Sequence, residues 1–336
     1  MIKEYISAIV NGRDLSRDQA HQAMLLVISG RVDPVQIAGF LTALKTKGET
    51  ADEMAGFVRA MRDKMVVINP AGISVDLCGT GSDRKNTFNI STTASFVASA
   101  AGLAVAKHGN RSVSSSCGSA DILEKLGVKI NLTPEAAEKC LNEIGYTFLF
   151  APNFHPAMKN VALVRKALGI PTVFNILGPL CNPAKVRRQL IGVYDSARCQ
   201  LVASTLKELG HETALVVHSE DGLDEISPTS PTNGILLLNG SVSRMAINPQ
   251  ALGIKAGAIT GLSVKDAGES VRMVHSVLNG EKSVARDAVL LNAGATLYIG
   301  GKSKSIAEGV TLAAETIDSG LARKKLEEFI NLSNKL

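Results

Sequence analysis

The stretch 73–126 constrains the fold of this chain more than any other, because it holds two successive strand–loop–helix units. An apolar run breaks into the loop Gly79-Thr80-Gly81-Ser82-Asp83 and continues into an alanine-rich helix. A second apolar run, 103–106, leads into the polar loop 107–119 and another helix. Alternating strands and helices predict a mainly parallel sheet, and such sheets bind ligands at the carboxyl ends of their strands.

The first loop has the residue types of an anion-binding site. Gly79 and Gly81 allow the backbone to approach a phosphate and to turn its N–H groups inward. The polar segment 89–92 adds side chains where the next helix begins, and the positive end of that helix favours negative charge. The second loop supplies Lys107 and Arg111, so the two loops together suit a ligand with two phosphate groups.

Common nucleotide-binding motifs do not fit these loops. The dinucleotide fingerprint needs a third glycine where this chain has Arg84, and no Gly-Lys-Ser/Thr sequence follows as in a P-loop. A Gly-x-Gly sequence alone is more often a tight turn. Two donor-rich loops at matched strand ends, however, are hard to explain as turns.

The N-terminal residues 2–67 have the periodicity of helices. Asp14, Ser16, Asp33 and Thr50 are the expected helix N-caps. A bundle of this size is too small to be stable alone, so we expect it to pack on something else, such as a second copy of itself. The segment 69–72 is predicted to be a hinge into the sheet.

The centre of the chain is predicted to mix helices, strands and turns. The expected elements are a helix over 133–144, a strand over 146–150, a turn over 151–156, a helix over 157–168 and a loop over 175–183. From Arg188 onward the sheet resumes, and further helices follow in the C-terminal part.

Composition excludes several classes of protein. With 45% hydrophobic residues among 336, the chain can bury a large core, and nothing has the composition of a disordered segment. The net charge of +5 comes from interspersed residues, which suits anionic small molecules and gives little support for nucleic-acid binding. The five cysteines are scattered, so we expect a reduced, cytoplasmic protein without zinc or disulfides. No apolar run could serve as a signal peptide or membrane span.

Adjacent carboxylates stand after a predicted strand that ends near His218. Asp224 and Glu225, with Asp221 nearby, are hard oxygen ligands without His or Cys partners. Such a set suits Mg²⁺ that also binds substrate phosphates. Taken alone, an acidic surface turn is the simpler interpretation, and both interpretations stand at this point.

Five other residues also have a structural and a functional interpretation. Single histidines such as His108 and His155 are more often structural hydrogen-bonding residues than bases. Arg165 fits a solvated arginine near a helix end. Asp83 caps a turn or orients ribose or metal-bound water, and Gly178 is a turn glycine or allows close approach of an aromatic ring.

Six motifs, in this order, resemble the anthranilate phosphoribosyltransferase family. They are GTGSD, NTFNIST, KHGNRSVSS, GSADILEKLG, RKALGIPTVFNILGPLCNP and DEISPTS. The resemblance covers nearly the whole chain, and KHGNR together with FNILGPLCNP is specific. The chain departs from the common family pattern at Ser82, at Arg84-Lys85 and at Ser116-Cys117, which bears on loop flexibility and pyrophosphate affinity.

The resemblance implies an α/β fold with a small N-terminal helical domain and a larger α/β domain around a mainly parallel sheet. The helical domain would comprise 1–70 joined by about 152–186, and the α/β phosphoribosyl-binding domain would comprise 71–151 and 187–336. It also implies a homodimer through the helical domain, with no nucleic-acid or membrane partner. An amidotransferase partner cannot be inferred from the sequence.

The implied reaction transfers the phosphoribosyl group of 5-phosphoribosyl 1-pyrophosphate (PRPP) to the amine of anthranilate in tryptophan biosynthesis. The products are N-(5-phosphoribosyl)anthranilate and pyrophosphate. An aromatic amine is neutral at pH 7, which fits a site without a general base. We therefore expect Lys107 and Arg165 to act electrostatically and by positioning, together with two Mg²⁺ ions.

The resemblance also implies three sets of binding residues. The PRPP set is Gly79, Thr80, Gly81, Ser82, Asp83, Thr87, Asn89, Ile90, Ser91, Thr92, Lys107, His108, Gly109, Asn110, Arg111, Ser112, Val113, Ser114, Ser115 and Ser119. The anthranilate set is Gly79, Asn110, His155, Arg165 and Gly178, and the metal set is Ser91, Asp224 and Glu225.

Two other functions are compatible with the same fold. A pyrimidine nucleoside phosphorylase would carry a Lys-His-Ser-type loop in place of KHGNR. A non-catalytic nucleic-acid-binding relative would show degraded phosphate loops and a concentrated basic stripe, and neither is evident in the sequence.

Overall fold

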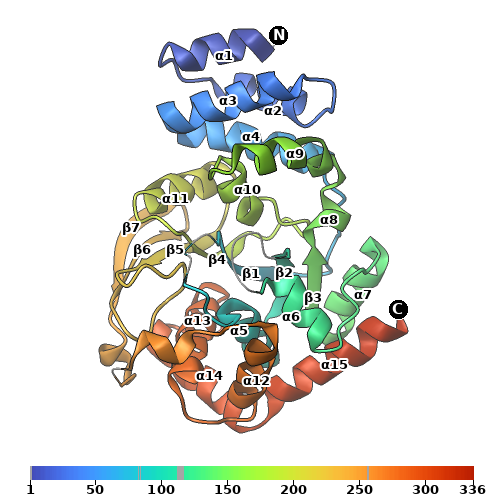
Figure 1. Ribbon diagram of the computed structural model, residues 1–336. Helices are drawn as coiled ribbons and strands as arrows, with labels where there is room; N and C mark the ends of the chain where they lie inside the picture. Colours follow the sequence, from blue (N-terminus) through green and yellow to red (C-terminus); the bar gives the residue numbers. More distant parts are fainter. Residues whose placement is uncertain (1, 82, 84, 112–116, 256) are drawn as a thin grey trace.

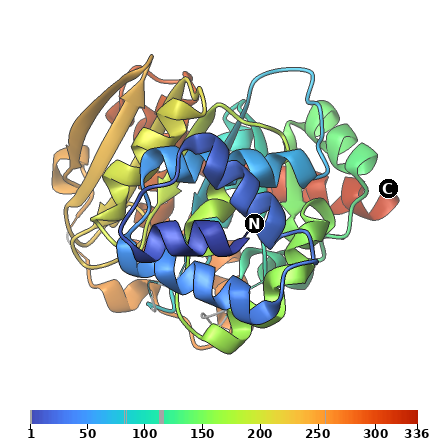
Figure 2. The ribbon, with the colours of Figure 1, turned by 90° about the horizontal axis from the view of Figure 1, so that it is seen from above.

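The computed structural model describes residues 2–81, 83, 85–111, 117–255 and 257–336. A bundle of N-terminal helices lies at one end of the molecule, above a central sheet (Figure 1). Its helices are α1 (Ile2–Val10), α2 (Arg17–Val27), α3 (Pro34–Lys47) and α4 (Ala51–Lys64). Figure 2 shows the same bundle from above, lying across the middle of the molecule.

The sheet has seven strands in the order β3-β2-β1-β4-β5-β6-β7. The strands are β1 (Ser74–Gly79), β2 (Ala104–Gly109), β3 (Tyr146–Phe150), β4 (Arg188–Gly192), β5 (Thr213–Ser219), β6 (Thr232–Leu238) and β7 (Ser241–Ile247). Pairing is parallel from β3 through β5, whereas β6 and β7 add an antiparallel edge. The expected fold class, a small helical part and a larger part with a mainly parallel sheet, is confirmed.

Helices surround the sheet on both faces (Figure 1). Between strands lie α5 (Ile90–Ala100), α6 (Ser119–Lys125), α7 (Pro134–Ile144), α8 (Ala151–Phe154), α9 (Lys159–Leu168), α10 (Phe174–Leu180) and α11 (Arg198–Glu208). After β7 come α12 (Ala267–Leu278), α13 (Val284–Ile299), α14 (Ile306–Asp318) and α15 (Leu321–Lys335). Three short 3₁₀ turns, at Pro156–Met158, Gln250–Leu252 and Ile259–Leu262, complete the described helices.

Two hydrophobic cores lie on opposite faces of the sheet. The first joins one face to α5, α6, α7 and the C-terminal helices. The second joins the N-terminal bundle to α9, α10, α11 and the other face of β4, β5 and β6. In this second core, Phe57 of α4, Val202 of α11 and Val216 of β5 are all fully buried. The helical bundle therefore shares its core with the sheet.

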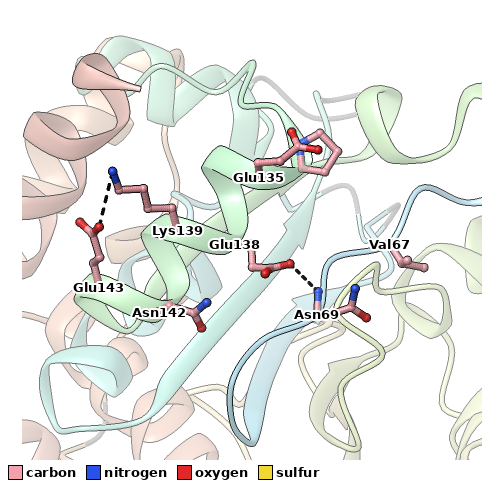
Figure 3. A pocket seen from close by; sticks show the side chains of 8 residues that line it. Val67, Asn69, Glu135, Glu138, Lys139, Asn142 and Glu143 are labelled. Carbon is pink, nitrogen blue, oxygen red and sulfur yellow. Dashed lines mark hydrogen bonds and ion pairs between the residues drawn. The ribbon is translucent and has the colours of Figure 1, made fainter.

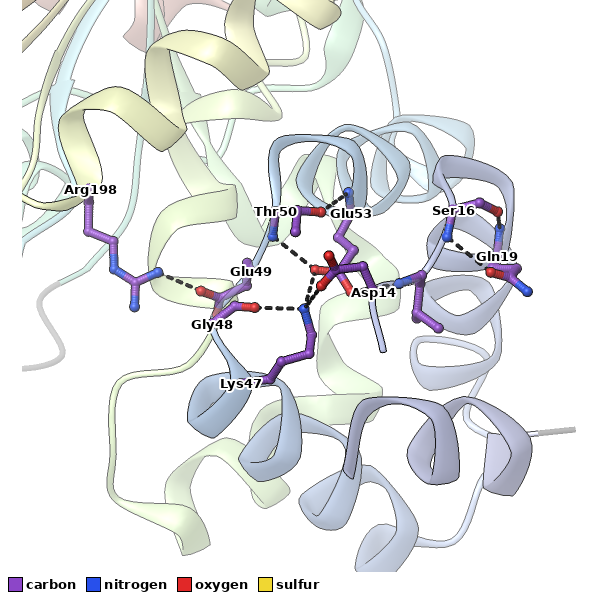
Figure 4. A network of polar contacts seen from close by, with 10 residues as sticks. Asp14, Ser16, Gln19, Lys47, Gly48, Glu49, Thr50, Glu53 and Arg198 are labelled. Carbon is purple, nitrogen blue, oxygen red and sulfur yellow. Dashed lines mark hydrogen bonds and ion pairs between the residues drawn. The ribbon is translucent and has the colours of Figure 1, made fainter. Parts of the chain in front are cut away.

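Polar contacts at the α3–α4 turn fix the bundle to the rest of the molecule (Figure 4). The carboxylate of Glu49 accepts a hydrogen bond from Nη1 of Arg198, the first residue of α11, at 2.5 Å. Ser16, Asp33 and Thr50 cap their helices as expected. Asp14 is not a cap, because its carboxylate pairs with Lys47 Nζ at 2.6 Å.

Two segments differ from the predicted elements. The predicted turn 151–156 begins with the short helix α8, and the predicted loop 175–183 contains the helix α10. Proline normally disfavours a helix interior, but Pro179 stands near the end of α10 and only one N–H is missing there. Burial of Phe174, Ile176, Leu177 and Leu180 outweighs this local preference.

The linker between α4 and β1 is held by α7. The backbone N–H of Asn69 donates to Glu138 Oε2 at 2.8 Å, and that of Ala71 donates to Asn142 Oδ1 at 3.1 Å. A cleft of about 460 Å³ lies between the linker and the polar face of α7 (Figure 3). The predicted hinge 69–72 therefore has side-chain partners in this conformation.

No helix in the described part of the chain is long and apolar enough to cross a membrane.

Candidate active site

The phosphate-type loop after β1 is built against the end of β4. Thr80 donates its N–H to Gly192 O at 2.9 Å, and Tyr194 donates its N–H to Thr80 Oγ1 at 3.2 Å. A Cβ at Gly79 would collide with the carboxylate of Asp224, and a Cβ at Gly192 with its backbone carbonyl. Glycine at these two strand ends therefore allows Asp224 to reach the loop, where its Oδ2 accepts from Gly81 N at 2.6 Å.

Three carboxylates from two loops gather at this edge of the sheet. Burial and the neighbouring charge of Asp83 raise the pKa of Asp224 to about 7. Burial and the charge of Asp224 raise the pKa of Glu225 to about 8, while its Oε1 accepts from Ser91 N at 3.1 Å. These shifts mean that the cluster is destabilised when fully ionised, so a bound cation would relieve it.

The donor set fits Mg²⁺ that shares its coordination with substrate oxygens. Asp224, Glu225 and the hydroxyl of Ser91 are hard oxygen ligands of the kind this ion prefers. Within the described residues, no group of three or more His, Cys, Asp or Glu side chains is arranged to hold a metal by itself. A magnesium ion here would therefore need water and phosphate to complete its coordination.

Lys107 supplies a fixed cation beside these carboxylates. The side chain is 1% exposed, and its Nζ donates to Leu77 O at 2.7 Å and to Ser91 Oγ at 3.3 Å. The charge of Lys107 also lowers the pKa of Glu225, against the larger effect of burial. Lys107 thus links the end of β2 to the start of α5.

Asn89 and Thr87 position the segment that precedes α5. Asn89 is the N-cap residue of α5 but makes no side-chain cap. Its Nδ2 donates to Cys117 O at 3.2 Å, and its Oδ1 accepts from Ser270 Oγ at 2.8 Å. Thr87 forms an isolated antiparallel bridge with Ser263. Ile90 and Thr92 of the predicted PRPP set are buried in the first turn of α5.

The loops after β1 and β2 are described only in part. Ser82, Ser112, Val113, Ser114 and Ser115 of the predicted PRPP set lie outside the described residues, as do Arg84 and Ser116.

In the described part of the loop after β2, the guanidinium of Arg111 is paired with two carboxylates. Its guanidinium contacts Asp121 Oδ1 at 2.9 Å and Glu124 Oε2 at 2.5 Å, and it lies 5.5 Å from the ring centre of Phe150. Ser119 donates its hydroxyl to Asn110 O at 3.2 Å. Arg111 would have to exchange these carboxylates for a phosphate in order to bind it.

Two buried histidines lie close together, one near the end of β2 and the other directly after α8. The ring centres of His108 and His155 are 5.1 Å apart. Burial, followed by the charge of His155, lowers the pKa of His108 to about 3, and burial lowers the pKa of His155 to about 4. The backbone of Gly178 beside His108 and that of Cys181 beside His155 partly oppose this lowering of the pKa.

Arg165 lies on α9 with its guanidinium 5.3 Å from the ring centre of Phe174. Burial lowers its pKa, and no carboxylate of the described residues pairs with it. Gly178 lies on the exposed surface of α10. Arg165 is therefore a desolvated cation able to accept an anionic partner.

Sequence reasoning missed the buried polar residues beneath these loops. Asp76, Asn182 and Gln189 are each at most 1% exposed, and both amide side chains donate hydrogen bonds to Asp76. Asp76 interrupts an apolar run, which was the one available signal. Ser270, which holds Asn89, gave no such signal.

Family comparisons agree with both parts of the fold. Residues 3–65 match a family described as the helical bundle domain of a glycosyl transferase family, and residues 71–323 match its a/b domain. Fold and site thus define a glycosyl transferase with a helical and an α/β part. Within that class, the chain belongs to the anthranilate phosphoribosyltransferase family.

Relatives with this family name match the chain from end to end. The protein from Alkaliphilus metalliredigens is 47% identical over 337 residues, covering 100% of this chain and 99% of the relative. The protein from Methanobrevibacter smithii is 48% identical over 334 residues, covering 99% of this chain and 100% of the relative.

Solved structures of the family have the same architecture. The Thermus thermophilus enzyme superposes with a TM-score of 0.93 at 39% identity, covering 98% of this chain and 99% of its own. The Saccharomyces cerevisiae enzyme, in a complex with PRPP and Mg, gives a TM-score of 0.92 at 29% identity. That comparison covers 100% of this chain and 98% of the yeast chain.

Proposed function

We propose that the loops at the carboxyl ends of β1, β2 and β5 bind PRPP and Mg²⁺, and that Arg165, His155 and their neighbours bind anthranilate. The protein is an anthranilate phosphoribosyltransferase, which transfers phosphoribose to the amine of anthranilate in tryptophan biosynthesis. The observation that supports the site assignment is a pair of opposite pKa shifts. The pKa values of the carboxyl groups of Asp224 and Glu225 are raised, whereas the pKa of the Arg165 guanidinium is lowered.

The first loop is the proposed cradle for the phosphates. The segment 79–81 offers its backbone at the end of β1, and Ser91 stands in the first turn of α5, where the helix favours anions. Lys107 is held in place by Leu77 O and Ser91, so its charge needs no reorganisation when pyrophosphate leaves. The described residues among the remaining predicted PRPP set are proposed to extend this cradle along the two loops.

We assign the metal site to Asp224, Glu225 and Ser91, with two ions. When bound, Mg²⁺ would neutralise charge on the leaving pyrophosphate. The backbone N–H groups of Gly81 and Ser91 donate hydrogen bonds to Asp224 and Glu225, respectively. One oxygen of each carboxylate is therefore held in a fixed orientation. Lys107 opposes part of the remaining negative charge.

Anthranilate is assigned to Arg165, His155, Asn110, Gly178 and Gly79. The guanidinium of Arg165 is desolvated and lacks a carboxylate partner in the described residues, which suits a bidentate bond to the substrate carboxylate. His108 and His155 are neutral at physiological pH, because their pKa values are about 3 and about 4. His155 provides an uncharged surface for an aromatic ring, and a neutral amine needs no base.

The helical domain is proposed to be discontinuous in sequence and to form the interface of a homodimer. Val161 and Val164 of α9 are buried in the same core as the N-terminal bundle, which supports a discontinuous helical domain of 1–70 and about 152–186. Val10, Val35 and Leu163 are exposed apolar residues on the neighbouring helices α1, α3 and α9. That surface supports a dimer through the bundle. The five free cysteines fit the cytoplasm.

Loss of anthranilate fluorescence tests the activity. The expected result on mixing protein, PRPP and anthranilate is a decay that requires both substrates and Mg²⁺. Pyrophosphate release, measured separately, should match the anthranilate consumed. A decay without PRPP, or phosphorolysis of thymidine in its place, would contradict the proposal.

A further inference from the structure

A buried carboxylate lies beneath both regions of the proposed site. Asp76, in the middle of β1, has no exposed surface, and each of its oxygens accepts hydrogen bonds. Oδ1 accepts from the backbone N–H of His108 at 3.3 Å. Oδ2 accepts from Asn182 Nδ2 at 2.8 Å and from Gln189 Nε2 at 3.3 Å. Burial raises the pKa of Asp76, whereas the charge of buried Lys107 and the hydrogen bonds from these donors favour the ionised carboxylate.

These partners lie at the base of two different substrate-facing segments. His108 stands two residues before Asn110 at the end of β2. Asn182 and Gln189 flank the chain between α10 and β4, where Gln189 Nε2 also donates to Pro179 O at 2.7 Å. Pro179 directly follows Gly178. The carboxylate therefore connects the segment that carries Asn110 with the segment that carries Gly178.

The amide side chains complete this connection. Asn182 Nδ2 donates to Ala106 O at 2.8 Å, and Asn182 Oδ1 accepts from Ala184 N at 2.8 Å. Gln189 Oε1 lies 3.1 Å from His211 Nε2. Asp76 is thus the common acceptor of a buried network whose donors come from β2, from β4 and from the chain after α10. A buried network of this kind fixes the geometry of its members.

We propose that Asp76 is a positioning residue for the acceptor substrate, which sets the distance between the Asn110 segment and the Gly178 segment. This inference rests on the proposed function, in which Asn110 is assigned to both PRPP and anthranilate and Gly178 to anthranilate alone. The PRPP loop leaves β1 through Gly79, whose position is fixed separately by Gly192 and Asp224. Loss of the Asp76 carboxylate should therefore affect anthranilate more than PRPP.

Asp76→Asn tests the proposal with little change of volume. An amide at this position presents an N–H₂ group either to His108 N–H or to the two side-chain donors, so one donor always faces another. We expect the anthranilate KM to rise about tenfold or more and the PRPP KM to change by less than about threefold. Equal changes in both KM values, or a lower Tm with both KM values unchanged, would overturn the proposal.

Two variants keep the test decisive if Asp76→Asn folds poorly. Gln189→Met preserves volume and removes the bonds to Asp76 and Pro179 O, so it should raise the anthranilate KM selectively by a smaller factor. Asn182→Asp combined with Asp76→Asn restores one charge and one donor–acceptor pair, and it should recover part of the anthranilate KM. Failure of both predictions would overturn the positioning role.

Ser99→Ala is the matched control. Ser99 is buried near the end of α5 and donates to Gly145 O, directly before the amino end of β3, at 2.9 Å. Its loss should lower the Tm without changing the ratio of the two KM values. If the wild-type protein showed no PRPP-dependent loss of anthranilate, the proposed function would fail. A wild-type protein that is active, with an unselective Asp76→Asn, would contradict only the positioning role.

Discussion

The metal end and the acceptor end of the site have opposite electrostatic imbalances. At the metal end, burial raises the pKa values of Asp224 and Glu225, because ionised carboxylates are crowded together with little water. At the acceptor end, burial lowers the pKa values of His108, His155 and Arg165, because charged bases are desolvated there. One region is completed by a cation and the other by an anion.

This difference explains how one site can select two ligands without a general base. In the proposed site, a divalent cation would relieve the crowded carboxylates, and an organic carboxylate would relieve the guanidinium of Arg165. The two histidines differ from the arginine, because a neutral imidazole avoids the free-energy cost of burying a charge. Each ligand should therefore depend on its own end of the site, and substitutions should separate the two.

The largest expected effect is at the metal end. Asp224→Asn removes a carboxylate from the proposed metal site, and we expect kcat/KM to fall about 100-fold at fixed Mg²⁺. A titration of activity with Mg²⁺ should also shift to higher concentration. Glu220→Gln is the matched control, because Glu220 is an exposed carboxylate in the same loop. An unchanged metal titration in Asp224→Asn would contradict the ligand role.

Arg165→Ala should affect the other end. Loss of a charged hydrogen-bonding group is expected to raise the anthranilate KM about 10- to 100-fold, with less than about a threefold change for PRPP. Lys166→Ala, at an exposed neighbouring position, should change neither value. Initial-rate kinetics with each substrate varied in turn measure both constants. A selective rise in the PRPP KM would reverse the assignment of the two ends.

The pH dependence of stability provides a third comparison. In the metal-free protein, the raised pKa values of Asp224, about 7, and Glu225, about 8, mean that the folded state binds their protons more tightly than the unfolded state. Their contribution to stability is lost as the pH rises through these values. Because Mg²⁺ competes with those protons, its stabilisation should increase from about pH 6 to about pH 9.

Thermal unfolding with and without Mg²⁺ measures this effect. The difference in Tm should grow with pH in the wild-type protein and in Glu220→Gln. It should be nearly independent of pH in a variant that combines Asp224→Asn with Glu225→Gln. A Mg²⁺-dependent difference that decreases as pH rises would contradict the assignment of these carboxylates.

The smallest effect is expected from the histidines. Because the pKa values of His108 and His155 are about 3 and about 4, both rings should be neutral, and the anthranilate KM should not vary between about pH 6 and about pH 8. His155→Asn should change that KM by about threefold, through lost contact and not through lost charge. A titration of the wild-type KM with a midpoint near pH 6.5 would show that burial does not control these rings.

The strands and loops of the phosphate-type site could be predicted from local patterns, because each pattern spans only a few neighbouring residues. Gly79, Asp224 and Glu225 could be identified as a glycine at a strand end and a pair of carboxylates. The antiparallel edge of the sheet also has a recognisable turn signal in the sequence. Asn239 and Gly240, both with positive φ, form the turn between β6 and β7, and an Asn-Gly pair between apolar runs is typical of a hairpin.

Long-range contacts could not be predicted from such patterns. The partners of Asp76 lie 32, 106 and 113 residues away along the chain. Helix α10 forms although it contains a proline, because its apolar side chains are buried in the core that the bundle shares with the sheet. Propensity describes neighbours in sequence, whereas these features depend on neighbours in space.

The shared core also determines when the bundle can become stable during synthesis. Its first four helices end at Lys64, but their core includes Val161, Val202 and Leu237. At typical rates of translation, a ribosome needs roughly 10 to 30 s to reach the last of these residues. For that interval the nascent N-terminal helices present an uncovered apolar surface, which makes them a natural substrate for chaperones that bind emerging chains.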